Sequence, residues 1–136
     1  MTGQLDIIGV GMVTAVGLDA PSSCAAMRAR LDGFQETRLI GSNDAWLVGA
    51  PVPLPRKWIG ERRLAHLAAG AIAEAFDHHP PARDNAALIL CLAEEEQPGR
   101  LVRDAAAFAA TIARILEIRP RHHTRLVAHG RPSGHV

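Results

Sequence analysis

The sequence contains few cysteines and no long apolar run, and these two shortages exclude several classes of protein. Two cysteines, Cys24 and Cys91, are too few for the disulfide framework of a small secreted domain. The longest uncharged stretch, residues 7–18, is broken by three glycines and is too short to span a bilayer as a helix. The chain also lacks the basic start of a secretory signal, and Asp6 interrupts its first apolar run. We therefore expect a cytoplasmic protein with reduced cysteines and no membrane partner.

Lysine and excess charge are also scarce. Lys57 is the only lysine among 15 basic residues, the formal net charge is +1, and 21% of the residues are charged. The chain as a whole is not a polyelectrolyte. Its arginines are not interleaved with aromatic residues, so they are weak evidence for a nucleic-acid site. We expect no nucleic-acid partner.

What the sequence does contain is enough apolar material for a core, since 48% of its 136 residues are hydrophobic. In the first half, Asp19 is a good helix cap, Pro21 suits a first helical turn, and Gly33 is a natural stop. For residues 5–52 we predict a buried strand over 5–13, a helix over 19–33, a polar connection over 34–44 and a short strand over 46–52.

The second half carries the clearest helical pattern, over residues 61–77. A narrow polar stripe at helical spacing faces a wide apolar face rich in small residues, which indicates close packing on a sheet. The stripe consists of Arg63, His66, Gly70, Glu74 and Asp77. The continuous apolar run 86–92 predicts a parallel strand buried on both faces, and residues 99–117 predict a last helix closed by Pro120. Alternating strands and helices predict an α/β layered fold.

The opening of the chain carries the most specific motif. An apolar strand breaks into a glycine-punctuated turn before a helix, with Gly9, Gly11, Thr14 and Gly17 at the turn. This arrangement resembles the start of the β-ketoacyl synthases, the condensing enzymes of the thiolase-like superfamily. The helix and glycine loop over 22–33 are also similar to that family, as are the alanine-rich helix and apolar strand over 62–92.

The resemblance implies a thiolase-like layered α/β fold, with a mixed sheet flanked by helices. Residues 1–120 would form the N-terminal portion of such a domain, and residues 121–136 a basic, histidine- and arginine-rich tail that leads as a loop into a missing remainder. Family members transfer an acyl group from an acyl carrier protein to a cysteine and condense it with a malonyl unit, as fatty-acid and polyketide biosynthesis require. They also pair two similar halves and dimerise, which implies a homo-oligomer or a missing C-terminal half.

The same resemblance implies that this chain alone does not catalyse the reaction. In the family the nucleophilic cysteine lies well beyond the equivalent of Val136, and the two histidines, or histidine and asparagine, that stabilise charge lie further still. No catalytic, cofactor or metal residue is therefore assigned. The expectation is an N-terminal portion of a synthase-like protein that lacks the nucleophile.

Two other functions stay open. The first is a degenerate synthase homologue that binds other proteins and has lost condensation. The second is a dinucleotide-binding domain, for which the motif G-x-G-x-x-G would require a third glycine where Thr14 stands, and an acidic residue at the end of a second strand. Glu36 is the nearest acidic residue, but the residues around it do not resemble a strand end.

Several reactive residues have ordinary structural interpretations. Cys91 lies in the apolar run and is expected to be a buried core residue, because burial disfavours a reactive thiolate. Cys24 is expected to pack on a helix, and His66 to be exposed on a polar face. Glu94, Glu95 and Glu96 are interpreted as a hydrated strand end. They are a weak candidate for a metal site, because the sequence around them does not space further oxygen ligands.

The basic tail supplies the only candidate contacts. Arg121, Arg125 and Arg131 are possible contacts for an acidic acyl carrier protein, which the family resemblance implies as a partner. The histidines of the same tail, His122, His123, His129 and His135, lack the paired spacing of a structural zinc site.

Overall fold

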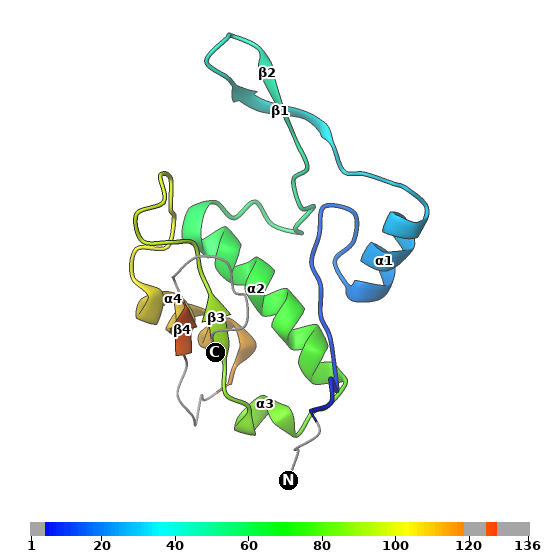
Figure 1. Cartoon of the computed structure of the whole chain (residues 1–136), viewed down its shortest axis with the longest axis vertical. Coiled ribbons are helices and arrows are strands. Elements are labelled where there is room, and N and C mark those ends of the chain that lie inside the picture. The colour runs from blue at the N-terminus through cyan, green and yellow to red at the C-terminus, as the bar shows by residue number, and fades with distance from the viewer. Residues whose placement is uncertain (1–4, 119–124, 128–136) are drawn as a thin grey trace.

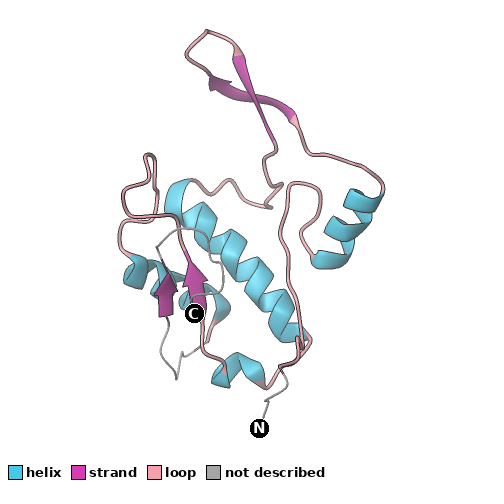
Figure 2. Cartoon of the chain, in the orientation of Figure 1, coloured by secondary structure: helices cyan, strands magenta, loops and turns pink. Residues whose placement is uncertain are grey.

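The computed structural model of the chain describes residues 5–118 and 125–127, and of the last three it describes the backbone only. Within these ranges helices and strands are mixed, as Figures 1 and 2 show, so the prediction of an α/β chain is confirmed. The elements are α1 (Ala20–Arg28), β1 (Gln35–Ile40), β2 (Trp46–Gly49), α2 (Gly60–Asp77), α3 (Ala82–Asn85), β3 (Ile89–Cys91), α4 (Ala105–Leu116) and β4 (Arg125–Val127).

The core lies between α2, α4 and β3. Ala65 and Ala69 of α2 are 0% and 2% exposed, and Ile112 of α4 is fully buried against the same cluster. Small side chains on α2 let α4 approach closely, and larger ones on α4 fill the space between the helices. The helix predicted over 61–77 is confirmed almost to the residue, and its apolar face is the one that packs.

The strand β3 is parallel to β4, with Ile89, Leu90 and Cys91 opposite residues 125–127. The parallel direction is as predicted, but two other expectations are wrong. The strand covers three residues rather than the apolar run 86–92, and only Leu90 is buried, so the strand is not covered on both faces. Cys91 is exposed and is not a core residue.

An antiparallel hairpin of β1 and β2 extends away from the helices (Figure 1). Its turn is closed by a hydrogen bond of 2.9 Å from Gly41 N–H to the carbonyl of Ala45, with Asp44 at a positive φ of 56°. Thr37 donates its hydroxyl across the hairpin to the carbonyl of Leu47 at 2.8 Å. The strand expected near 46–52 is confirmed as β2, but the polar connection over 34–44 is wrong because most of it forms β1.

The helix α1 begins as predicted and ends early. Asp19 caps it, accepting the backbone N–H of Ser22 at 2.7 Å, and Pro21 lies in the first turn. The helix stops at Arg28, because Arg30 adopts a left-handed φ of 56° before Gly33 is reached. The side chain of Leu31 is therefore outside the helix and exposed.

The opening segment, residues 5–13, is not a buried strand. Leu5 is 98% and Ile7 is 88% exposed, and the segment pairs with no strand of the described chain. It lies instead against α2 (Figure 1). A side chain at Gly11 would overlap the carbonyl oxygen of Ala71, so only glycine permits this approach.

A glutamate of α2 anchors this segment. The carboxylate of Glu74 accepts the backbone N–H of Met12 at 2.8 Å and that of Ala20 at 2.7 Å. One side chain therefore ties the opening segment and the start of α1 to α2. Its place on the predicted polar stripe is explained by this role.

The helix α4 starts later than predicted, at Ala105 rather than near Gly99. Asp104 caps it through the N–H of Ala107 at 2.9 Å, and Gly99 lies in the preceding loop with φ of 78°. The short helix α3 was not foreseen; its Arg83 donates to the carbonyl of Leu116 at the end of α4. The strand β4 falls inside 121–136, so that segment is not entirely a loop.

We predict that Glu74→Ala lowers the free energy of unfolding by about 2 kcal/mol, because two partly buried N–H groups lose a charged acceptor. Urea denaturation followed by circular dichroism measures this. The stability of Glu74→Gln should lie between those of the unchanged protein and Glu74→Ala, since its amide keeps only one of the two acceptor oxygens. Asp77→Ala, a control on the same helix, should change stability by less than about 0.5 kcal/mol. Equal losses for Glu74→Ala and Asp77→Ala would contradict the anchoring role.

Candidate functional site

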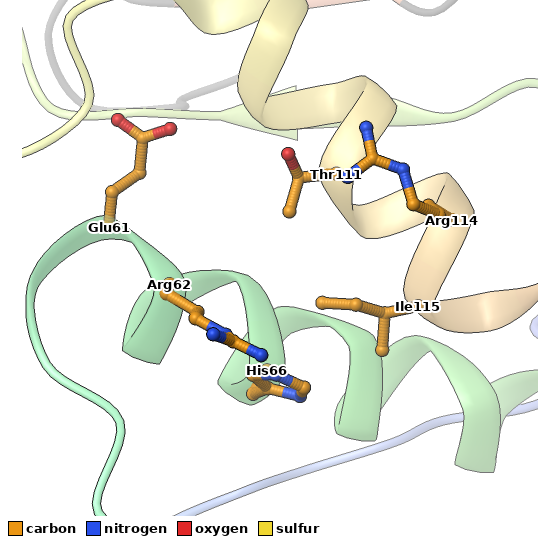
Figure 3. Close-up of a pocket in the computed structure, with 6 residues that line it drawn as sticks. All are labelled: Glu61, Arg62, His66, Thr111, Arg114 and Ile115. Carbon is orange, nitrogen blue, oxygen red and sulfur yellow. The ribbon is translucent and has the colours of Figure 1, made fainter.

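The groove between α2 and α4 gathers five polar side chains around one cavity. Its volume is about 530 Å³. Figure 3 shows its lining residues, which are Glu61, Arg62 and His66 of α2 and Thr111, Arg114 and Ile115 of α4.

Helical spacing places these side chains on facing surfaces. Arg62 and His66 are four residues apart on α2, and Thr111 and Ile115 are four apart on α4, so each pair shares a face. Figure 3 shows Glu61 at one end of the groove and Arg114 toward the other. Thr111 donates its hydroxyl to the carbonyl of Ala107 at 3.0 Å, which leaves its oxygen lone pairs available.

The charged groups of this groove have no partner within the described part of the chain. Among those residues, Glu61, Arg62 and Arg114 form no hydrogen bond or ion pair through their side chains. Two guanidinium groups against one carboxylate make the lining cationic. Guanidinium groups donate in a planar fork that suits carboxylate and phosphate oxygens. The groove can therefore bind an anionic group.

His66, which lines this groove, stacks on Trp58. The two rings stack with centroids 3.5 Å apart and planes at 14°. Arg63 holds the preceding segment to α2 by donating to the carbonyl of Val52 at 2.7 Å. His66 was predicted to be simply exposed, but the stacking makes it partly buried.

Stacking and neighbouring charge favour the neutral form of this histidine. Burial first, then Arg62, then Arg56, lower the pKa of His66 below its ordinary value of 6.5. At neutral pH the ring is therefore an uncharged face for Trp58, and the positive charge of the groove comes from its arginines.

The candidate carrier contacts of the tail are not brought to this groove by any described contact. Arg125 begins β4, of which only the backbone is described, and Arg121 and Arg131 lie outside the described residues. Arg62 and Arg114 are not among the candidate residues that the sequence indicates. The sequence places them only at helical spacing from His66 and Thr111, and polar residues on any solvated helix face have the same spacing.

The glycine turn does not offer a phosphate site at the start of α1. Two carboxylates already occupy its first N–H groups, since Asp19 accepts from Ser22 and Glu74 accepts from Ala20. Hydrogen bonds from the Ser22 hydroxyl and then its backbone N–H lower the pKa of Asp19, which keeps that carboxylate ionised. Dinucleotide motifs place pyrophosphate at this position, so negative charge here opposes that function.

The two cysteines lie on different elements. Cys24 is partly buried within α1, and Cys91 ends β3. Over residues 5–118, neither sulfur forms a hydrogen bond or an ion pair. In the same described residues no group of three or more His, Cys, Asp or Glu side chains could hold a metal ion, and Glu94, Glu95 and Glu96 are all exposed.

Searches against protein-family models, curated proteins and solved structures find no match to this chain. Among the helices described, none combines the length and the apolar character needed to cross a membrane.

We predict that the fold loses stability as the pH falls below about 6.5 through the lowered pKa of His66. The unfolded chain binds this proton more readily than the folded chain, so protonation favours unfolding. Urea denaturation at pH 7.5 and pH 5.0 should give a smaller loss for His66→Gln than for the unchanged protein. An identical loss in both proteins would assign the pH dependence to other groups.

Proposed function

We propose that this chain is a non-catalytic portion of a β-ketoacyl-synthase-like protein, and that its α2–α4 groove docks an acidic acyl carrier protein. The observation that carries the docking is the pair of guanidinium groups, Arg62 and Arg114, that face one groove without an ionic partner among the described residues. An acidic surface would supply the missing charges, and complementary charge accelerates and orients such encounters.

The thiolase-like part of the proposal is supported by the opening segment. Gly9 and Gly11 allow an apolar extended chain to lie against the carbonyls of Ala71 and Ala75. The outward side chains, among them Leu5 and Ile7, stay exposed. A row of exposed apolar residues on an extended segment is typical of a strand that lacks its neighbours. In a thiolase-like layer that segment would be completed by a further strand.

The non-catalytic part is supported by the cysteines. A nucleophilic cysteine requires a neighbouring base, a cation or a helix N-terminus that favours thiolate. Cys24 is in the middle of α1 and Cys91 follows two apolar residues on β3, and the described residues give neither an ionic or hydrogen-bonding partner. Acyl transfer and decarboxylative condensation would then belong to residues of a complete homologue.

A degenerate homologue that acts only as a protein-binding partner is the second candidate. The exposed apolar side chains of the hairpin favour it. Leu39, Ile40, Trp46 and Val48 are each more than half exposed on β1 and β2, which extend away from the core. In both candidates this chain binds and does not catalyse.

The docking is tested by titrating the protein with an acyl carrier protein and following binding by calorimetry. We predict that the double variant Arg62→Glu, Arg114→Glu weakens binding by about tenfold or more, because two attractive charges become repulsive. Raising the salt concentration should weaken binding of the unchanged protein.

The control is a double variant with the same change in charge on another element, Arg28→Glu with Arg30→Glu. It should leave the affinity within about twofold, because these residues lie at the exposed end of α1. Equal weakening by both double variants would contradict docking at the groove, because the binding would then depend only on the net charge of the protein. No binding at low salt would overturn the docking.

Catalysis is tested separately with an acyl thioester of N-acetylcysteamine and intact-mass measurement. We expect no acyl adduct. An adduct that disappears with Cys91→Ser or Cys24→Ser would overturn the non-catalytic assignment and would leave the docking result unaffected.

A further inference from the structure

A second cavity lies beside β3, on a different part of the α2 surface from the α2–α4 groove. Its volume is about 350 Å³, within the lower range of small-molecule sites. The walls come from two helices and two chain segments. They are Leu64 and Ala68 of α2, Phe108 of α4, residues 91–93 at and after the end of β3, and residues 100–102 of the loop before α4. This cavity shares no lining residue with the α2–α4 groove.

Its lining is apolar with one charged exception. Apart from Cys91 and Arg100, every lining residue is aliphatic or aromatic. Phe108 and Val102 are buried members of the core, so this part of the wall is held rigidly. A preformed apolar wall with one charged group is the usual composition of a small-molecule site.

The charged exception is unsatisfied. The Nε of Arg100 is enclosed by protein and has no hydrogen-bond partner. No described residue accepts a hydrogen bond from the rest of its guanidinium or pairs with its charge. Glu95 lines a neighbouring cavity together with Arg100 but forms no ion pair with it. A buried donor without an acceptor is costly and rare in folded proteins, more so when it carries charge.

The thiol of Cys91 lies on the same wall and is exposed. This thiol can serve as a chemical probe of the cavity. A molecule that fills the cavity lies against Cys91, so we expect the rate at which Cys91 reacts to report on occupancy. Cys24, on α1, lines none of this cavity and serves as an internal reference.

From these observations we infer that the cavity beside β3 binds a small monocarboxylate with a compact apolar body. The apolar walls from α2, α4 and the loop hold the body of the ligand. The guanidinium of Arg100 pairs with its carboxylate and gains the anionic partner that the described residues do not provide. The inference is independent of carrier docking, because the two cavities have no residue in common.

The test compares benzoate with benzamide, which has the same ring and nearly the same shape but no charge. Wild-type protein is labelled with N-ethylmaleimide, and the modification of each cysteine is followed by peptide mass at constant ionic strength. We expect benzoate to slow labelling of Cys91 along a saturating curve, by about fivefold at four times its dissociation constant. Benzamide should slow it by less than about 1.5-fold, because it leaves Arg100 without a counter-charge. Cys24 should react at the same rate throughout.

Three variants locate the recognition. Arg100→Gln should abolish protection by benzoate, and Arg100→Lys should retain part of it because the positive charge stays. Arg103→Gln removes a neighbouring arginine that lines a different cavity and should leave protection unchanged. Circular dichroism of each variant confirms that it is folded before labelling.

Equal protection by benzoate and benzamide would overturn the inference, because the cavity would then recognise only an apolar ring. Protection that survives Arg100→Gln would overturn it as well. So would the absence of protection by benzoate up to about 100 mM, because an affinity weaker than this is too low for specific binding.

Discussion

The structure depends on close packing of small residues around α2. On one side, Ala65 and Ala69 let α4 and β3 approach until Ile112 and Leu90 fill the space between them. On another, the carbonyls of Ala71 and Ala75 lie so near Gly9 and Gly11 that no side chain fits at either glycine. A helix with larger residues at these positions would hold off both neighbours, and dispersion contacts on both sides would be lost.

Polar contacts then determine how the rest of the chain is attached to this helix. Glu74 binds the opening segment and α1, and Arg63 binds the segment that follows the hairpin. Glu74 accepts from two backbone N–H groups that would otherwise lack a partner, which is why its loss is more costly than the loss of an ordinary surface contact. Arg63 adds a second hydrogen bond to the carbonyl of Val52, which also accepts the N–H of Leu54. The hairpin has no comparable attachment among the described contacts, and its apolar side chains stay exposed.

The two cavities show how a chain of nearly zero net charge can still favour anions locally. Formal charge is +1 overall, yet Arg62, Arg114 and Arg100 stand at cavities without paired carboxylates in the described structure. The attraction between charges strengthens where the local dielectric is low. Such an arrangement suits binding of anionic groups.

The sequence by itself determined the elements whose signals are local. The wide apolar face and narrow polar stripe of 61–77 predicted α2, and Asp19 with Pro21 predicted where α1 begins, because periodicity and caps act within a few residues. Only the tertiary structure decided which apolar segments are covered. Residues 5–8 and Cys91 look like core in the sequence but are exposed, since burial depends on neighbours distant along the chain. That Arg62, Arg114 and Arg100 find no counter-charge among the described residues is equally invisible in the sequence, because the tertiary fold decides which groups lie near an arginine.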